Sequence, residues 1–285
     1  MKELILGDKR FLLGKKTLIM GILNITPDSF YDGGRFNSIE KAVLHAKRME
    51  KDGADIIDVG GESSRPGSLG ISIKDELDRV IPVINKLIDE ISIPISIDTY
   101  KSKIAEESLK LGGSMVNDIT ALRGDKDLAR IIAEYDVPVC LMHMKGDPKT
   151  MQKDPKYSDV VTEIYDFLSE RKEYAISRGI SKDKIIIDPG LGFGKRTGGG
   201  IEDNCVILNK LRKLKETDCP ILVGASRKTF IGNICGGKNK ISPDDRLEGS
   251  LAAACISVIN GADIVRVHDV KETKRCIDLI DCVIK

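Results

Sequence analysis

The sequence lacks the features that mark secreted, membrane-spanning and nucleic-acid-binding proteins. Its first 16 residues hold no long apolar core and no small-residue cleavage site. No stretch reaches the roughly 18 uncharged apolar residues of a membrane span. The formal net charge is only +1, from 45 basic and 44 acidic side chains, so no overall field attracts nucleic acid or an anionic membrane. We therefore expect a cytoplasmic protein that binds small molecules, with no nucleic-acid or membrane partner.

The cysteines lack the spacing of a disulfide framework or a zinc site. There are seven, an odd number, and none forms a C-x-x-C pair. Two of them stand in apolar surroundings, Cys140 in VPVCLM and Cys255 in AAACIS. Buried, reduced thiols in a reducing compartment fit this pattern better.

The chain does contain a regular alternation of short, β-branched apolar runs with longer amphipathic segments. Runs without polar alternation are typical of parallel strands that are covered on both faces. Hydrophobic residues make up 41% of the 285 residues, enough for a barrel of parallel strands, which needs about 250 residues as one domain. The predicted strands are 18–23, 56–59, 94–97, 115–116, 137–142, 185–187, 221–223 and 264–267.

The segments between these runs predict helices. Ser72 stands three residues before Asp75, which is an approximate capping box, and Pro82 is expected to kink the helix that follows. Glycine follows several of the segments, as a left-handed C-terminal cap requires. The predicted helices are 38–51, one after residue 72, 102–111, 128–135, 160–177, 204–215, 247–260 and 272–283, with a further helix after the SRK motif.

Two similar seven-residue segments indicate a repeated strand–helix unit. GADIIDV at 53–59 and GADIVRV at 261–267 both read as a helix end, a short turn and a buried strand. About eight such units favour a closed (β/α)8 TIM barrel over an open, doubly wound sheet, and LIMGILNIT lacks the G-x-G-x-x-G expected after the first strand of the latter. We expect one α/β domain over 18–285 and an N-terminal appendage over 1–17, as a hairpin at the barrel floor.

Polar residues follow every predicted strand. In barrel enzymes the carboxyl ends of the strands face the mouth of the active site, so the set predicts a functional site there. Four residues are basic and suit a phosphorylated substrate, whose oxygens match the planar fork of arginine: Arg65, Lys228, Arg266 and His268. Opposite them stand Asp98, Asn117 and Asp188, which suit an amino-substituted heterocycle with several N–H donors.

Two glycine-rich loops, TPDSFYDGGRF at 26–36 and GGESSRPGSLG at 60–70, have the composition of lids that close over a site, although mobile surface loops share it. From the residues alone, Lys228 could also be the Schiff-base lysine of an aldolase. His143, after the fifth strand, is interpreted as structural.

Seven motifs together resemble dihydropteroate synthase, and they run from about residue 18 to the C-terminus in that family's order. They are GILNITPDSFYDGG, DVGGESSRPG, SIDT, VNDI, DPGLGFGK, VGASRKTFIG and VRVHDV. The resemblance implies a TIM barrel, a homodimer, and a transferase of folate biosynthesis that requires Mg2+ and is a sulfonamide target. Its reaction joins 6-hydroxymethyl-7,8-dihydropterin diphosphate to 4-aminobenzoate and gives 7,8-dihydropteroate and diphosphate.

The resemblance also implies a role for individual residues. Matching positions assign the pterin pocket to Asp98, Asn117, Met142, Asp188 and Lys228, and the diphosphate site to Asn24, Arg65, Arg266 and His268. Asn24 is also the Mg2+ ligand. The 4-aminobenzoate contacts fall on Ser64, Pro66, Phe193 and Thr229, and the catalytic roles on Asp32, Lys228, Arg266 and His268.

Departures from the family's pattern leave the reaction type intact. Ser64 and Thr229 each keep a hydroxyl where the family commonly has threonine and serine, and the connection KRTGGGIEDN is longer than usual. Two alternatives stay open. One is a pterin-binding methyltransferase that transfers a methyl group to a corrinoid and needs no diphosphate site. The other is a non-catalytic paralogue that binds pterin.

Overall fold

The computed structural model describes residues 2–25, 34–63, 68, 70–147, 149–198, 200–237, 239 and 241–285. Within them, eight parallel strands follow one another in the order β8-β7-β6-β5-β4-β3-β10-β9. A parallel bridge between Ile187 and Ile221 joins the two edge strands and closes the barrel. The strands are β3 (Leu18–Asn24), β4 (Ile56–Gly60), β5 (Ile95–Asp98), β6 (Met115–Asp118), β7 (Val139–Met142), β8 (Ile185–Asp188), β9 (Leu222–Val223) and β10 (Ile264–Val267).

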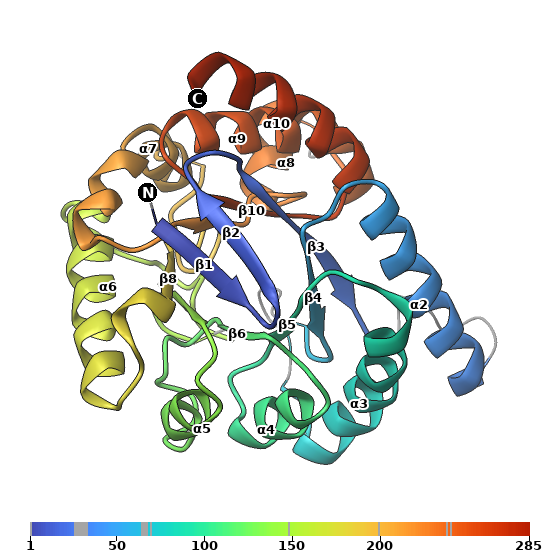
Figure 1. The fold of residues 1–285 in the computed structure, drawn as a ribbon. Coiled ribbons are helices and arrows are strands. Elements are labelled where there is room, and N and C mark those ends of the chain that lie inside the picture. The colour runs from blue at the N-terminus through green and yellow to red at the C-terminus, as the bar shows by residue number, and fades with distance from the viewer. Residues whose placement is uncertain are drawn as a thin grey trace.

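Helices form a ring around these strands (Figure 1). They are α2 (Gly34–Lys51), α3 (Ile73–Glu90), α4 (Ser102–Lys110), α5 (Leu128–Tyr135), α6 (Val160–Ser177), α7 (Asp203–Asn209), α8 (Thr229–Gly236), α9 (Leu247–Ile259) and α10 (Val270–Ile284). Short 3-10 helices stand at η1 (Lys182–Lys184), η2 (Leu211–Thr217) and η3 (Pro243–Asp245). The predicted TIM barrel is therefore confirmed. None of the helices in the described ranges has the length and apolar character to cross a membrane.

One predicted helix is wrong in part. The segment 204–215 is not a single α-helix, because α7 ends at Asn209 and η2 begins at Leu211. Leu211 and Leu214 are both buried, and a 3-10 helix repeats every three residues, so it places this pair on one face toward the core. The capping prediction is confirmed, since Ser72 Oγ accepts a hydrogen bond from the backbone N–H of Asp75 at 3.1 Å.

The N-terminal residues form an antiparallel hairpin of β1 (Lys2–Leu6) and β2 (Lys9–Leu13). It crosses the centre of the ring in Figure 1. Leu4, Leu6 and Leu13 pack in one cluster with residues near the amino ends of the barrel strands, among them Leu18 and Ile264. The hairpin thus covers the end of the barrel opposite the strand ends that carry the polar residues.

The two similar segments, GADIIDV and GADIVRV, lead into β4 and β10, the strands on the two sides of β3. Asp55 and Asp263 hold equivalent positions in the two repeats, each just before a strand. Asp55 Oδ2 accepts from the N–H of Ile19 at 2.9 Å, and Asp263 Oδ2 accepts from the N–H of Ile221 at 2.8 Å. Each aspartate therefore bonds the neighbouring strand at the same level and helps to set the register of the sheet.

Candidate active site

The strand register brings the predicted polar residues together at the carboxyl ends. Asn24 lies opposite Gly60, Gly60 opposite Asp98, and Asp98 opposite Asn117. Farther around the barrel, Met142 lies opposite Asp188. A Cβ atom at Gly60 would lie 3.2 Å from that of Asp98, so glycine here lets the Asp98 side chain lie close to the backbone of β4. Six neighbouring strands, β3 to β8, thus contribute residues to the mouth of the barrel.

A cavity opens at this layer. Most of the residues that the sequence singled out line it, namely Asp98, Asn117, Met142, Asp188, Phe193, Lys228, Arg266 and His268. Ile22, Ile119 and Leu191 add an apolar surface, and Ser226 adds a hydroxyl. The cavity thus combines an apolar lining with carboxyl groups, an amide and basic side chains.

Arg266 is held between two carboxylates inside the cavity. Its Nε donates to Asp58 Oδ2 at 2.5 Å, and its Nη2 donates to Asp98 Oδ2 at 2.6 Å. Asn117 Nδ2 donates to the same Asp58 oxygen at 3.0 Å. The guanidinium is therefore fixed in orientation by two charge-assisted hydrogen bonds, and no hydrogen bond joins its Nη1 to another residue in the described part of the chain.

Asp58 is a residue that the sequence analysis missed. It is completely buried on β4, and it connects Arg266 to Asn117. The two similar segments contained a signal for this residue, because Asp58 and Arg266 occupy the same position in GADIIDV and GADIVRV with opposite charge. Both strands pair with β3, so the two side chains can reach each other.

Burial changes the acid–base state of the cavity. It raises the pKa of Asp98 to about 7, although the Arg266 guanidinium opposes the shift. It also raises the pKa of Asp188 to about 6, against a hydrogen bond from the N–H of Gly190. Near neutral pH both carboxyl groups are poised between their protonated and ionised forms, an arrangement that is common at functional sites.

The pKa values of the basic side chains Lys228 and His268 are shifted in the opposite direction, downward. Burial lowers the pKa of Lys228 to about 8, and its Nζ lies 4.0 Å from the centre of the Phe193 ring. Burial, with Arg266 nearby, lowers the pKa of His268 to about 3. His268 is therefore neutral at pH 7, with Nδ1 3.0 Å from Ser226 Oγ, and it can offer a hydrogen bond but no full charge.

Other predicted residues lie apart from this cavity or outside the described part of the chain. Asn24 ends β3 and Thr229 begins α8, and neither is among the residues that line the cavity. Asp32, Ser64, Arg65 and Pro66 fall outside the described residues, so their roles stay predictions.

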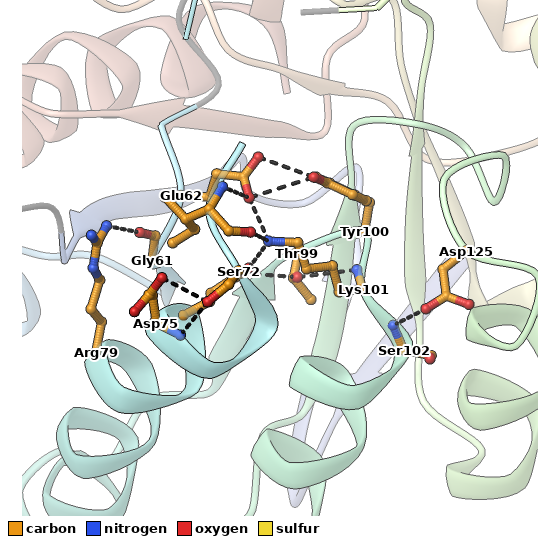
Figure 2. Close-up of polar contacts among 12 residues, drawn as sticks. Gly61, Glu62, Ser72, Asp75, Arg79, Thr99, Tyr100, Lys101, Ser102 and Asp125 are labelled. Atoms are coloured by element: carbon orange, nitrogen blue, oxygen red, sulfur yellow. Dashed lines mark hydrogen bonds and ion pairs between the residues drawn. The ribbon is translucent and has the colours of Figure 1, made fainter. Parts of the chain in front are cut away.

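A second polar cluster lies beside the end of β5 (Figure 2). Lys101 Nζ donates to Glu62 Oε2 at 2.5 Å, to Glu76 Oε2 at 2.6 Å and to the carbonyl of Ile71 at 2.8 Å. Tyr100 OH donates to Glu62 Oε1 at 3.1 Å. This network links the segments that follow β4 and β5 to the start of α3, and the sequence analysis did not predict it.

The donors available for a metal ion are few. Among the described residues, no group of three or more His, Cys, Asp or Glu side chains could hold a metal. Asn24 offers one neutral amide oxygen on a half-buried side chain at the barrel mouth. This donor fits Mg2+, which takes oxygen ligands and usually keeps several waters besides substrate phosphates.

Comparison with known proteins agrees with this geometry. The family model described as pterin binding enzyme matches residues 20–268. The chain is 43% identical to dihydropteroate synthase of Clostridium beijerinckii over 98% of this chain and 99% of that protein. It is 45% identical to dihydropteroate synthase of Escherichia coli K12 over 93% of this chain and 91% of that one.

Solved structures give the same result. A Xanthomonas albilineans dihydropteroate synthase with 4-aminobenzoic acid superposes with a TM-score of 0.90, at 40% identity, over 99% of this chain and 97% of that chain. These relatives decide against the aldolase alternative. The chain belongs to the dihydropteroate synthase family of pterin-binding enzymes.

Proposed function

We propose that the cavity binds 6-hydroxymethyl-7,8-dihydropterin diphosphate and transfers its pterinylmethyl group to 4-aminobenzoate, giving 7,8-dihydropteroate and diphosphate. One observation carries this proposal. Asp98, Asn117, Asp188, Lys228 and Arg266, which come from five different strands or strand ends, line one cavity. The match to pterin-binding enzymes over residues 20–268 supports the assignment of the ligand.

The pterin ring would lie in the inner part of the cavity. The carboxylates of Asp98 and Asp188 accept hydrogen bonds from its amino and ring N–H groups, and Asn117 offers an amide. Met142 supplies an apolar wall. Polar groups that are buried without partners are costly, so a ring lacking the matching donors is rejected.

The diphosphate would lie toward the mouth, near His268 and the remaining Nη1 of Arg266. Asn24 would hold Mg2+, which when bound neutralises charge on the diphosphate oxygens. His268 is neutral, so it contributes a hydrogen bond, and the charge comes from Arg266, whose pKa is raised by Asp58 and Asp98 even though burial opposes the shift. Charge that develops on a leaving group is stabilised most by such preorganised donors.

The reaction then needs no covalent enzyme intermediate. The bond between the methylene carbon and the diphosphate oxygen breaks, its electron pair leaves with diphosphate, and the electron-rich pterin stabilises the resulting cation. The aminobenzoate amine forms the new C–N bond and releases one proton to water. Phe193 lines the side of the cavity next to Lys228, which supports its predicted contact with the aminobenzoate.

The test is diphosphate release from the pterin diphosphate, measured with and without 4-aminobenzoate and Mg2+. We expect release that depends on both. A pterin that binds without aminobenzoate-dependent release would favour a non-catalytic paralogue. A chelator titration with added Mg2+ tests the metal separately.

A homodimer is the second part of the proposal. Ile256 and Ile259 on α9 are 44% and 40% exposed, whereas Ile277 is 1% exposed and belongs to the barrel core. Leu279 and Val283 on α10 extend the exposed apolar surface, and α9 packs against α10. Light scattering on the purified protein decides, and a monomer at micromolar concentration would refute it.

We also propose a cytoplasmic location. It is supported by the seven cysteines, all of which are free thiols in the structure. Fractionation of cells into cytoplasm, periplasm and membrane checks this directly.

A further inference from the structure

Lys195 is a buried lysine that the mechanism above does not use, and burial lowers its pKa to about 7 although Asp188 opposes the shift. It follows the glycine-rich turn after β8, and only 1% of its surface is exposed. A lysine is almost never buried so fully unless its charge has partners. Its position next to the cavity therefore requires an explanation.

The ammonium group of Lys195 has three acceptors around it. Its Nζ lies 2.8 Å from the carbonyl oxygen of Gly190, 3.0 Å from that of Phe193 and 3.0 Å from His143 Nδ1. An ammonium has three N–H donors, so each finds one acceptor if Nδ1 of His143 carries no proton. Burial, with Lys195 nearby, lowers the pKa of His143 to about 2, in agreement with a neutral acceptor.

The turn that Lys195 contacts is unusual in how it is held. Gly190, Gly192 and Gly194 all have a positive φ, a backbone conformation that residues other than glycine rarely adopt. A Cβ atom at Gly190 would lie 1.9 Å from the carbonyl oxygen of His143, so the turn lies directly on the end of β7. One backbone bond, from the N–H of Phe193 to Gly190, closes the turn at 3.0 Å.

Side chains supply the other contacts of this turn. Gln152 Nε2 donates to the carbonyl of Gly192 at 2.6 Å, and Tyr157 OH donates to that of Gly194 at 2.5 Å. Lys195 differs from these two because it bonds the first and the last residue of the Gly190–Phe193 turn at once. Both of those residues line the cavity.

We propose that Lys195, with neutral His143 as its third acceptor, is a positioning residue that fixes the Gly190–Phe193 turn and thereby places the Phe193 ring against Lys228. It touches no substrate itself. This step rests on the proposed function, in which the Phe193 ring contacts the aminobenzoate. Displacement of that ring therefore weakens aminobenzoate binding more than pterin binding.

The first test replaces Lys195 with methionine, which keeps the length of the side chain and removes all three donors. Amide hydrogen exchange of the peptide over 189–195 is then measured by mass spectrometry. We expect exchange in this peptide at least about tenfold faster than in the wild type, because local opening of a turn depends on the bonds that close it. Lys172→Met is the matched control, because Lys172 donates to a single carbonyl, that of Thr217, outside the cavity.

A second pair of variants tests the acceptor and does not depend on the folding of the first variant. His143→Asn keeps an oxygen near the place of Nδ1, whereas His143→Leu removes the acceptor. We expect near wild-type exchange of the turn in the former and faster exchange in the latter. Equal exchange in both variants, or unchanged exchange in Lys195→Met, overturns the proposal.

Steady-state kinetics supply the readout that a merely structural role would not move. For Lys195→Met we expect the KM for 4-aminobenzoate to rise about tenfold or more, and the KM for the pterin diphosphate to change less than about threefold, because small displacements of a positioning group are costly. Equal changes in the two KM values would refute the claim that Lys195 acts on the aminobenzoate side of the cavity. If the wild type shows no aminobenzoate-dependent turnover, the proposed function fails, while the exchange experiment still decides the role of Lys195.

Discussion

Lys101 lies between the carboxylates of Glu62 and Glu76, and its replacement by methionine tests how much this buried network stabilises the barrel. The variant removes the ammonium from both carboxylates and from the carbonyl of Ile71. Glu62 then keeps only neutral donors such as the Tyr100 hydroxyl (Figure 2), and Glu76 keeps the Thr99 hydroxyl, so neither negative charge has a cation beside it. Breaking a buried ion pair by removing one partner costs about 3–5 kcal/mol. We therefore expect Lys101→Met to lower the free energy of unfolding by that amount.

The loss should depend on pH in a defined direction. Burial already raises the pKa of Glu76, and Lys101 opposes this shift. Without Lys101 the pKa of Glu76 rises further, so the folded variant holds a proton to a higher pH than the unfolded chain does. Its stability then falls as the pH rises through the interval between the two pKa values. The cost of the substitution should thus be larger at pH 8 than at pH 5.

Urea or thermal denaturation at both pH values measures this effect. One kcal/mol corresponds to roughly 2–4 °C in a protein of this size class, so the expected loss at pH 8 is on the order of 10 °C in Tm. Lys103→Met is the matched control. That lysine lies two residues farther along, in the first turn of α4, but its side chain is 49% exposed and its pairs with Glu106 and Glu107 are at the surface. It should cost less than about 1 kcal/mol.

A second substitution separates charge from packing. Glu76→Gln in the Lys101→Met background removes one of the stranded carboxylates, and we expect it to restore part of the stability at pH 8. A cost of Lys101→Met below about 1 kcal/mol, or an equal cost at pH 5 and pH 8, would refute the reasoning.

Three further predictions concern the cavity. Asp98→Asn should weaken pterin binding by about tenfold or more, since an amide cannot replace a carboxylate beside Arg266. Fluorescence titration with a pterin that lacks the diphosphate measures this affinity. An affinity near that of the wild type would place the pterin pocket elsewhere. In the wild type, the affinity for that pterin should fall as the pH drops from 8 to 5.5. Asp98 and Asp188, with pKa values of about 7 and 6, become protonated over this range, so each loses its negative charge and one of its two acceptor oxygens becomes a donor. A flat profile contradicts this. Asp58→Asn removes a charge that raises the pKa of Asp98, so the midpoint of the same profile should move to lower pH, and a shift to higher pH would show that Asp58 acts differently.

Much of the architecture followed from local patterns. A strand that is buried on both faces has to be apolar at successive positions, so the runs at 56–59, 185–187 and 264–267 could be located without their partners. The helices 128–135 and 160–177 have the predicted bounds, because their apolar periodicity begins and ends there. The polar residues after the strands could be assigned to one site, because parallel strands in a barrel end on one face.

Only the tertiary structure decided which charges meet. Arg266 and Asp58 are 208 residues apart in the chain, and their ion pair depends on β4 and β10 both lying beside β3. Lys101 resembled an ordinary helix-start lysine, and Lys195 an ordinary loop lysine, until folding enclosed them. Hydrophobic periodicity is a property of neighbours in the chain, whereas the environment of a charge is set by groups that closure of the barrel brings within about 3 Å. The sequence alone therefore determined the barrel and the face that carries the site, and the closed barrel determined the charge state and orientation of the residues within it.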